Sequence, residues 1–384
     1  MSRPDGADGT LGADSSSLEQ GARITFSYSV PQPKVNAKNW IGLFPRGQEP
    51  VDGRKVGQYA AWEYAPAASG EVGFGTGQVK PGEYVACYLY DDGYASLAEP
   101  VRFTVRAVPP MPPPGYAGEF GRTGRAPGRL DRPAGLAVDG RGLLWVADSG
   151  NNRVQQFTPD GRLRWVLDAG SLNEPQAVAV DGGGNVFVAD TGHNRIVEFA
   201  WWGGFLREFG VGELDNPRGV AVAGGQLLAT DTGHERVLRF DLRTGKPAGE
   251  ITAKMSGPQG IAVADDGGVW VVQNGIRDSG RNGIVRYSPA GEPTTTVGYG
   301  QYSRFGGLSN PAQVALDPAG RLYVTVPDYG WVAQFRTGGP FLNEFGTEGR
   351  GLLRFPIGVA LDARGRVFVA DTGNDRIVQF GVKR

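Results

Sequence analysis

From residue 133 to the end of the chain, short apolar runs alternate with small and polar residues at nearly constant spacing. Gly135–Val138 and Leu144–Ala147 are examples, each rich in branched or aromatic residues and bounded by Gly, Asp or Pro. Such runs are too short for amphipathic helices and are typical of β-strands separated by tight turns. The pattern therefore predicts an all-β fold with many short strands.

The runs belong to a repeat that is present in six copies. Four copies carry an Asp followed five residues later by an Arg, at the turn between two predicted strands. The copies begin at Pro133, Pro175, Pro217, Pro258, Pro311 and Pro356. The Asp and Arg pairs are Asp148 and Arg153, Asp190 and Arg195, Asp231 and Arg236, and Asp371 and Arg376.

Four strands in a repeat of roughly 42 residues are the content of one blade of a β-propeller. The last copy ends too early to supply its own fourth strand, whereas residues 116–121 match the fourth-strand pattern of Phe205–Gly210. We therefore expect 116–121 to complete the last blade and to close a six-bladed ring, which removes an exposed sheet edge.

The copies resemble the NHL repeat, which is marked by Pro-x-Gly-[Val/Ile]-Ala-Val-Asp, by Val-Ala-Asp-[Ser/Thr]-Gly-Asn-x-Arg and by Phe-Gly. The resemblance covers about residues 116–384, is strong in four copies and degenerate in two. It implies a six-bladed β-propeller of the NHL type, in agreement with the count of repeats.

Residues 21–106 do not repeat, and their aromatic-rich runs predict a small β-sandwich with Trp40 and Trp62 in its core. The segment resembles the immunoglobulin-like SKICH sandwich, which implies an adaptor or localisation module. The features that carry this resemblance are Asn39–Phe44, Trp62–Tyr64, Ser69–Val72, Pro81–Tyr84 and Asp91–Tyr94.

The remaining segments predict the domain boundaries. Residues 1–20 are polar and predict a disordered lead-in, residues 107–115 are proline-rich, and residues 116–384 form the propeller. The proline-rich segment is typical of a semi-rigid spacer, with an SH3-type ligand as the alternative.

The composition and net charge limit which classes of partner and which locations are expected. The 62 glycines agree with many tight turns, and the net charge of −1 argues against nucleic acid or an anionic membrane as the main partner. A single cysteine excludes an intramolecular disulfide. No apolar run is long enough to span a bilayer and no signal peptide is recognisable, so the default location is the cytoplasm.

The repeated Asp and Arg favour a structural role, because an ion pair that recurs in four blades belongs to the blade. His193 and His234 occupy one equivalent turn position, where either a turn filler or a metal ligand fits. Asn fills the same position in other copies, which favours the turn filler.

The candidate binding surface lies where the repeat breaks down, in the fourth and fifth copies and in the loop between them. Gln273 and Gly283 replace the pair in the fourth copy, and Val326 and Trp331 replace it in the fifth. Aromatic and arginine residues are enriched in binding hot spots, although drift of two old repeats explains the same changes. The candidate ligand-binding residues are Tyr299, Tyr302, Phe305, Tyr329, Trp331, Asn274, Arg277, Arg281 and Arg304.

The function that these observations favour is a non-catalytic scaffold that binds a protein or small-molecule ligand on one face of the propeller, without a cofactor. One alternative is a propeller hydrolase or lyase of the lactonase type, with calcium or zinc at the mouth of the channel. Another is the binding of single-stranded RNA by arginines in the stretch 120–133.

Overall fold

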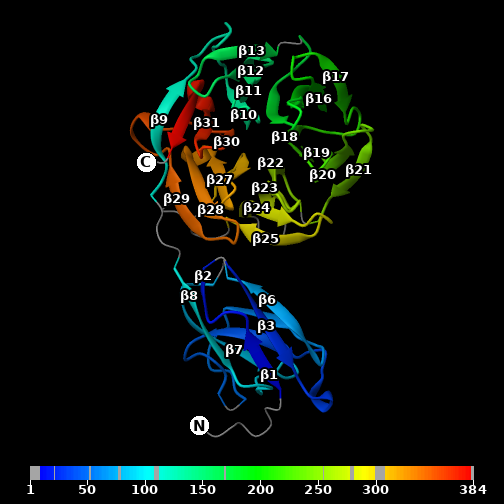
Figure 1. Ribbon diagram of the computed structural model, residues 1–384, viewed down its shortest axis with the longest axis vertical. Coiled ribbons are helices and arrows are strands. Elements are labelled where there is room, and N and C mark those ends of the chain that lie inside the picture. The colour runs from blue at the N-terminus through cyan, green and yellow to red at the C-terminus, as the bar shows by residue number, and fades with distance from the viewer. Residues whose placement is uncertain are drawn as a thin grey trace. The chain divides into compact units, whose positions relative to one another are not determined.

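A computed structural model describes residues 9–20, 22–51, 53–76, 79–107, 112–167, 170–253, 255–276, 281–298 and 308–381. The chain divides into two compact units, one on either side of the proline-rich segment. Each unit is built almost entirely from β-strands (Figure 1). Among these described residues, no helix is both long enough and apolar enough to cross a membrane.

The N-terminal unit is a sandwich of two sheets around one apolar core. Alternate residues of β3, such as Phe26 and Tyr28, point into this core and meet Tyr88 and Phe103 of the opposite sheet. The first sheet has the order β1-β3-β6, with β1 (Thr10–Ala13), β3 (Arg23–Ser29) and β6 (Ser69–Gly75). The second has the order β2-β8-β7-β4-β5, with β2 (Ser17–Glu19), β4 (Trp40–Pro45), β5 (Ala61–Tyr64), β7 (Gly82–Leu89) and β8 (Val101–Arg106), and a 3-10 turn, η1 (Gln32–Lys34), precedes β4.

The prediction of a disordered lead-in over residues 1–20 is wrong for its second half. Strand β1 pairs antiparallel with β3, and β2 pairs in parallel with β8. Leu18 of β2 is buried in the sandwich core. These strands are short and contain Gly, Ser and Glu, so their own pattern is weak and only the pairing with longer neighbours defines them.

The second sheet carries another apolar cluster on the face turned away from the sandwich core. Trp40, Phe44 and Cys87 are buried there, and the Trp40 and Trp62 rings meet edge to face at 6.3 Å. The side chain of Trp62 is exposed, because β5 is the edge strand of its sheet. The prediction that Trp62 is a core residue is therefore wrong, whereas Trp40 is buried as predicted.

The C-terminal unit consists of six four-stranded sheets. In the first five sheets the chain runs outward from the first strand to the fourth (Figure 1). The first sheet consists of β10 (Pro133–Val138), β11 (Leu144–Asp148), β12 (Arg153–Phe157) and β13 (Leu163–Leu167). The second consists of β14 (Pro175–Val180), β15 (Val186–Asp190), β16 (Arg195–Phe199) and β17 (Phe205–Phe209). The third consists of β18 (Pro217–Ala223), β19 (Gln226–Asp231), β20 (Arg236–Asp241) and β21 (Pro247–Ile251).

The next two sheets follow the same order, and the sixth takes its fourth strand from the start of the unit. The fourth consists of β22 (Pro258–Val263), β23 (Val269–Ile276), β24 (Arg281–Tyr287) and β25 (Pro293–Val297). The fifth consists of β26 (Val314–Leu316), β27 (Arg321–Val326), β28 (Trp331–Arg336) and β29 (Phe341–Phe345). The sixth is β30 (Val359–Leu361), β31 (Val367–Asp371), β32 (Arg376–Gly381) and β9 (Gly115–Phe120). Short 3-10 turns are η2 (Ser149–Asn151), η3 (Thr191–His193), η4 (Pro327–Tyr329), η5 (Gly349–Gly351) and η6 (Thr372–Asn374).

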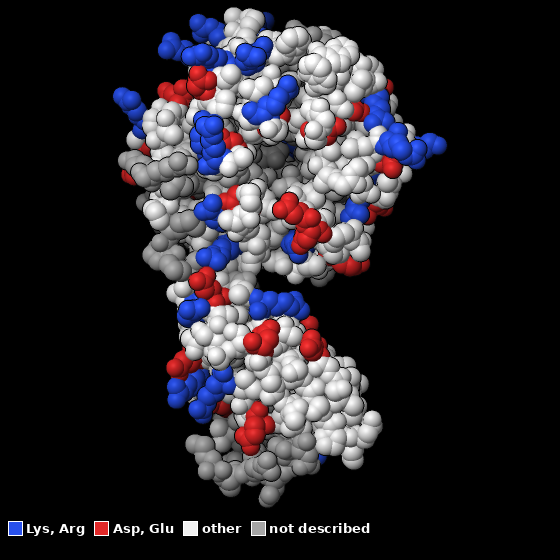
Figure 2. All heavy atoms as spheres, in the orientation of Figure 1, with Lys and Arg blue, Asp and Glu red and all other residues white. Residues whose placement is uncertain are grey.

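The sheets form a closed ring, because the first strands contact one another in sequence and β10 also contacts β30. Apolar side chains fill the space between neighbouring sheets: Phe209 from β17 packs with Phe240 from β20 at a ring distance of 5.6 Å. In Figure 2 the centre of the ring is hollowed, and positive and negative side chains are interspersed around it on the face shown.

The predicted closing strand is confirmed. Strand β9 pairs antiparallel with β32, with Phe120 opposite Ile377 and Tyr116 opposite Phe380. Segments from the two ends of the propeller thus lie side by side in one sheet (Figure 1). The predicted fold class, an all-β propeller of NHL type preceded by a small β-sandwich, is confirmed.

Candidate functional site

Two kinds of connection meet on one face of the propeller, which we call the entry face. Entry loops lead from the fourth strand of one blade to the first strand of the next, and central turns join the second and third strands. The Asp131 N–H in an entry loop donates to Asp148 at a central turn, at 2.7 Å. Equivalent bonds recur around the ring, so the central turns determine where the entry loops lie.

A buried carboxylate ends the second strand in four blades. Asp190, for example, accepts the Asn173 N–H at 2.6 Å and the Arg195 Nε–H at 2.7 Å. Its side chain is completely buried, so each oxygen needs a donor. The same pattern recurs at Asp148, Asp231 and Asp371.

The arginine of the pair also binds a glutamate of the fourth strand in three of these blades, at Arg195, Arg236 and Arg376. Arg376 donates to the Leu352 carbonyl at 2.9 Å and pairs with Glu119 of β9. Burial raises the pKa of Asp148, and hydrogen bonds from the Asp131 N–H, Asn151 and Arg153 oppose that rise. These bonds account fully for the repeated pair and agree with its structural interpretation.

Hydroxyl groups join neighbouring blades just after each of these aspartates. The Thr191 hydroxyl donates to the Pro217 carbonyl at 2.6 Å, and the Thr372 hydroxyl donates to the Pro133 carbonyl at 2.7 Å. The second bond links the last blade to the first. The Ser or Thr of the repeated Asp-[Ser/Thr]-Gly motif is therefore an inter-blade contact.

The residue before the repeat proline has a left-handed backbone in all six blades. Its N–H is bonded to the previous central turn where the structure shows a partner: the Glu174 N–H donates to Asn152 at 2.9 Å, and the Asn216 N–H donates to Asn194 at 2.8 Å. The six residues are Arg132, Glu174, Asn216, Gly257, Asn310 and Phe355, with φ between 46° and 53°.

The residue after the repeat proline lines the mouth of the channel in every blade. Two pockets open there and share Gln176, Phe355 and Ile357. Their cavity volumes are ≈ 80 Å³ and ≈ 460 Å³. The post-proline residues are Ala134, Gln176, Arg218, Gln259, Ala312 and Ile357.

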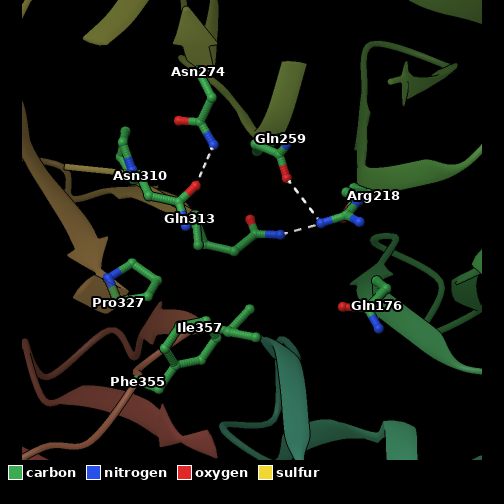
Figure 3. Close-up of a pocket in the computed structure, with 11 residues that line it drawn as sticks. Gln176, Arg218, Gln259, Asn274, Asn310, Gln313, Pro327, Phe355 and Ile357 are labelled. Carbon is green, nitrogen blue, oxygen red and sulfur yellow. Dashed lines mark hydrogen bonds between the residues drawn. The ribbon is translucent and has the colours of Figure 1, made fainter. Parts of the chain in front are cut away.

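Five of the eleven residues that line the smaller pocket carry amide side chains (Figure 3). Arg218 lies near Gln259, with 3.4 Å between Nη1 and Oε1, and the Asn274 amide donates to Asn310 at 2.8 Å. Gln313 stands where four other copies have Gly and one has Ala. At those glycines the inner strands come close: a Cβ on Gly358 would lie 2.0 Å from the Ala134 carbonyl oxygen.

The larger pocket has an apolar wall beside two arginines. Phe355, Ile357 and Ala134 form the wall, and Arg132 and Arg354 lie next to it. Phe355 is 47% exposed and combines a bulky side chain with φ 51°. A bulky residue in this conformation is a strained outlier, and such outliers cluster at functional sites.

Where the repeat breaks down, other contacts replace the ion pair. In the fourth blade Gln273 accepts the Ser256 N–H at 3.0 Å and donates to the Tyr287 hydroxyl at 2.7 Å. In the fifth blade Val326 and Trp331 are buried in the core between the blades. The interpretation of Trp331 as a ligand-binding residue is therefore wrong, because its side chain is 2% exposed.

The other predicted binding residues divide into two groups. Tyr329 is exposed and its ring lies 5.0 Å from that of Trp331, and Asn274 lines the smaller pocket. The remaining predicted residues lie outside the part of the chain, or the side chains, that the structure describes: Tyr299, Tyr302, Phe305, Arg277, Arg281 and Arg304.

The two histidines are hydrogen-bonded to the buried aspartates of their own turns. His193 Nδ1 lies 3.0 Å from Asp190, and His234 Nδ1 lies 2.9 Å from Asp231. Within the described residues, no group of three or more His, Cys, Asp and Glu side chains is placed to hold a metal ion. The calcium or zinc alternative stays a prediction.

Sequence reasoning missed the mouth residues, although the signal is in the repeat. The position after the proline carries Ala, Gln, Arg, Gln, Ala and Ile, whereas the proline before it is constant and the residue after it is Gly in four of the six copies. A variable position inside a regular repeat marks a residue that the blade itself does not need. Only the closed ring shows that all six such positions converge.

Comparisons with known proteins agree with this architecture. The NHL repeat family model matches residues 130–157, 172–199 and 353–380. Protein lin-41 of Caenorhabditis elegans is 55% identical over 42 residues, which are 11% of this chain and 4% of that protein. Protein wech of Drosophila melanogaster is 48% identical over 46 residues, 12% of this chain and 6% of that protein. The matched stretches thus span a small part of these relatives.

Solved structures show the same fold at low sequence identity. Streptogramin B lyase superposes with a TM-score of 0.52 and 16% identity, covering 69% of this chain and 97% of that chain. A structural genomics protein of unknown function from Bacteroides thetaiotaomicron superposes with a TM-score of 0.53 and 12% identity, covering 97% and 98%. At these identities the likeness shows the fold alone. The chain therefore carries NHL repeats on a β-propeller, as its own periodicity predicts.

Proposed function

We propose that this protein is a non-catalytic recognition protein that binds a ligand at the channel mouth on the entry face of its propeller. The observation that carries the proposal is the convergence of one post-proline side chain from each of six blades on this mouth. Because the surrounding blades hold the backbone rigidly, these side chains vary without cost to the fold. Repeat proteins use such variable positions on one face for binding.

The chemistry of the mouth supports recognition. The residues that line the two pockets carry amides, guanidinium groups, hydroxyls and apolar side chains, and none of them is a carboxylate, imidazole, thiol or amine. The Ser149 and Thr372 hydroxyls there donate to carbonyls of the next blade. This set can orient a ligand, but it contains no acid–base pair of the kind that hydrolysis needs.

A crosslinking experiment tests the proposal. A photoreactive residue in place of Glu174, which is exposed at the rim of the mouth, should capture a ligand from an extract of the source cells. The same residue in place of Asp160, in the β12–β13 turn of the opposite face, should not capture it.

The matched control is a variant without the aromatic side chain of the pocket wall, Phe355→Ala. We expect Phe355→Ala to abolish capture from the Glu174 position while the thermal unfolding midpoint stays that of a folded protein. Equal capture from both positions, or capture that is indifferent to Phe355, would refute the channel mouth as the binding site.

A further inference from the structure

The ionisable side chains of the channel mouth are of one sign, whereas the loops around it carry both signs. Every ionisable residue that lines the two pockets is an arginine: Arg132 and Arg354 in one, and Arg218 in the other. Exposed charges of both signs surround the mouth on the entry loops and central turns. The carboxylates that the structure describes include Glu174, Glu213, Asp215, Asp328 and Glu348, and the arginines include Arg122, Arg125, Arg129 and Arg350.

The three arginines are available to a ligand. Arg354 holds its backbone in place through an N–H bond to Asp371 at 2.6 Å, while its guanidinium makes no hydrogen bond or ion pair with any described residue. Arg132 approaches Asp131 and Glu174 only at 3.8 Å and 4.0 Å, and the guanidinium of Arg218 makes one contact with the described residues, at 3.4 Å from the Gln259 amide. Exposed pairs of this kind bind weakly and exchange readily.

We infer that the ligand of the channel mouth is a short acidic peptide segment, whose carboxylates bind Arg132, Arg218 and Arg354. The inference rests on the proposed function and adds the chemical class of the ligand. Guanidinium groups bind carboxylates through charge-assisted hydrogen bonds, often two at a time.

The rest of the mouth fits a peptide. Gln176, Gln259 and Gln313 offer both donors and acceptors, which match the N–H and carbonyl groups of an extended backbone. Phe355 and Ile357 lie beside Arg354 and fit an apolar side chain next to an acidic one. The cavity of ≈ 460 Å³ lies within the usual range for small ligand pockets.

The lining of the mouth favours a peptide over RNA as the ligand. Recognition of single-stranded RNA relies on aromatic or arginine side chains on which successive bases stack, and Phe355 is the one aromatic residue among the described residues that line the two pockets. The net charge of −1 supplies no basic field along which a nucleic-acid strand would lie.

Direct binding to the full chain tests the inference. The probes are a fluorescently labelled hexapeptide of alternating Glu and Leu, the same peptide with Gln in place of Glu, and hexauridylate. At low salt we expect the Glu peptide to bind at least about tenfold more tightly than the Gln peptide or the RNA. Raised salt should weaken its binding.

Charge-neutral variants locate the site. Arg354→Gln and Arg218→Gln should each weaken binding of the Glu peptide by about tenfold, whereas Arg350→Gln should leave it unchanged. Arg350 is exposed in the same entry loop as Arg354 but lines neither pocket. It therefore controls for net charge, and unfolding curves of all three variants control for folding.

The remaining outcomes distinguish the proposed recognition function from the acidic peptide as its ligand. If none of the probes binds, yet capture from Glu174 depends on Phe355, the recognition function stands and the acidic ligand is wrong. If hexauridylate binds more tightly than the Glu peptide and depends on the same arginines, the ligand is RNA. If Arg350→Gln weakens the peptide as much as Arg354→Gln does, the attraction is non-specific.

Discussion

Six residues of the propeller hold a left-handed backbone immediately before a proline. The following proline disfavours the right-handed helical region, and the left-handed region is costly for any residue with a side chain. The fourth blade avoids the cost with Gly257, whereas the sixth accepts it with Phe355. The contrast indicates that the ring of Phe355 is kept for a reason other than stability.

A comparison of two substitutions at Phe355 measures this strain. Both Phe355→Gly and Phe355→Ala remove the ring, but only glycine relieves the backbone, so the Gly variant should be more stable by about 1 kcal/mol. Denaturant unfolding gives the difference. At Ile357, which has no positive φ, the order should reverse, and the same order at both positions would contradict the strain.

Cys87 gives a residue-scale prediction for pH. Burial in β7 raises the pKa of this thiol from 9.0 to about 12. The folded state keeps the thiol neutral while the unfolded state ionises it. The contribution of the thiol to stability is therefore fully present below pH 9.0 and is lost as the pH rises toward about 12.

Unfolding curves of the wild type and Cys87→Ala check this sign. The free energy of unfolding of the wild type should fall relative to the variant by about 1.4 kcal/mol per pH unit within that window. At pH 8, iodoacetamide should leave the native thiol unmodified and label it only after denaturation. Parallel curves, or rapid labelling of the native protein, would show that the thiol is accessible.

At the scale of the element, the central turn has a charged version and an apolar version within one chain. Four blades use a buried Asp with an Arg, and the fifth uses Val326 with Trp331 at the same positions. Breaking a buried ion pair leaves the surviving charge uncompensated, whereas replacing both partners by apolar residues is often tolerated. The fifth blade is a natural example of the second case.

A double-mutant cycle in the third blade tests this equivalence. Asp231→Val alone should cost about 3 kcal/mol, because Arg236 and His234 lose their carboxylate. Adding Arg236→Trp should recover part of that loss, and the coupling is the departure from additivity in denaturant unfolding. Strictly additive effects would show that the two versions of the turn are not interchangeable.

At the scale of the whole molecule, β9 closes the ring. It places Tyr116 against Phe380 in one inter-blade core and Phe120 near Phe157, with 5.2 Å between the ring centres, in the next. Glu119 reaches Arg376 across the closure. The strand thus contributes to two cores and to one central turn, and its loss exposes the edge of β32.

Two truncated chains isolate the effect of the closing strand. A chain of residues 122–384 should unfold several degrees below a chain of residues 107–384, since a loss of about 1 kcal/mol lowers the midpoint of a domain of this size by about 2 °C. Calorimetry measures the difference, and the longer chain controls for removal of the sandwich. Equal midpoints would show that the closure does not stabilise the ring.

The sequence by itself determined the strands of the propeller, the number of its blades and the closing strand. Each is encoded by local periodicity, by the six prolines and by the match of 116–121 to Phe205–Gly210. Strands β1 and β2 were not predicted from the sequence, because their own pattern is weak and they form by pairing with the longer strands β3 and β8. The sequence also did not show that Trp331 is buried, since a tryptophan in a turn can lie either at the surface or in the core.

Only the tertiary structure decided where the site lies. Ala134 and Arg218 are 84 residues apart in the chain, and nothing local to either indicates that both line one mouth. Closure of the ring turns a sequence period of roughly 42 residues into proximity around an axis. It also brings Arg132, Arg218 and Arg354 to one mouth, because distance from that axis is not a property of any segment.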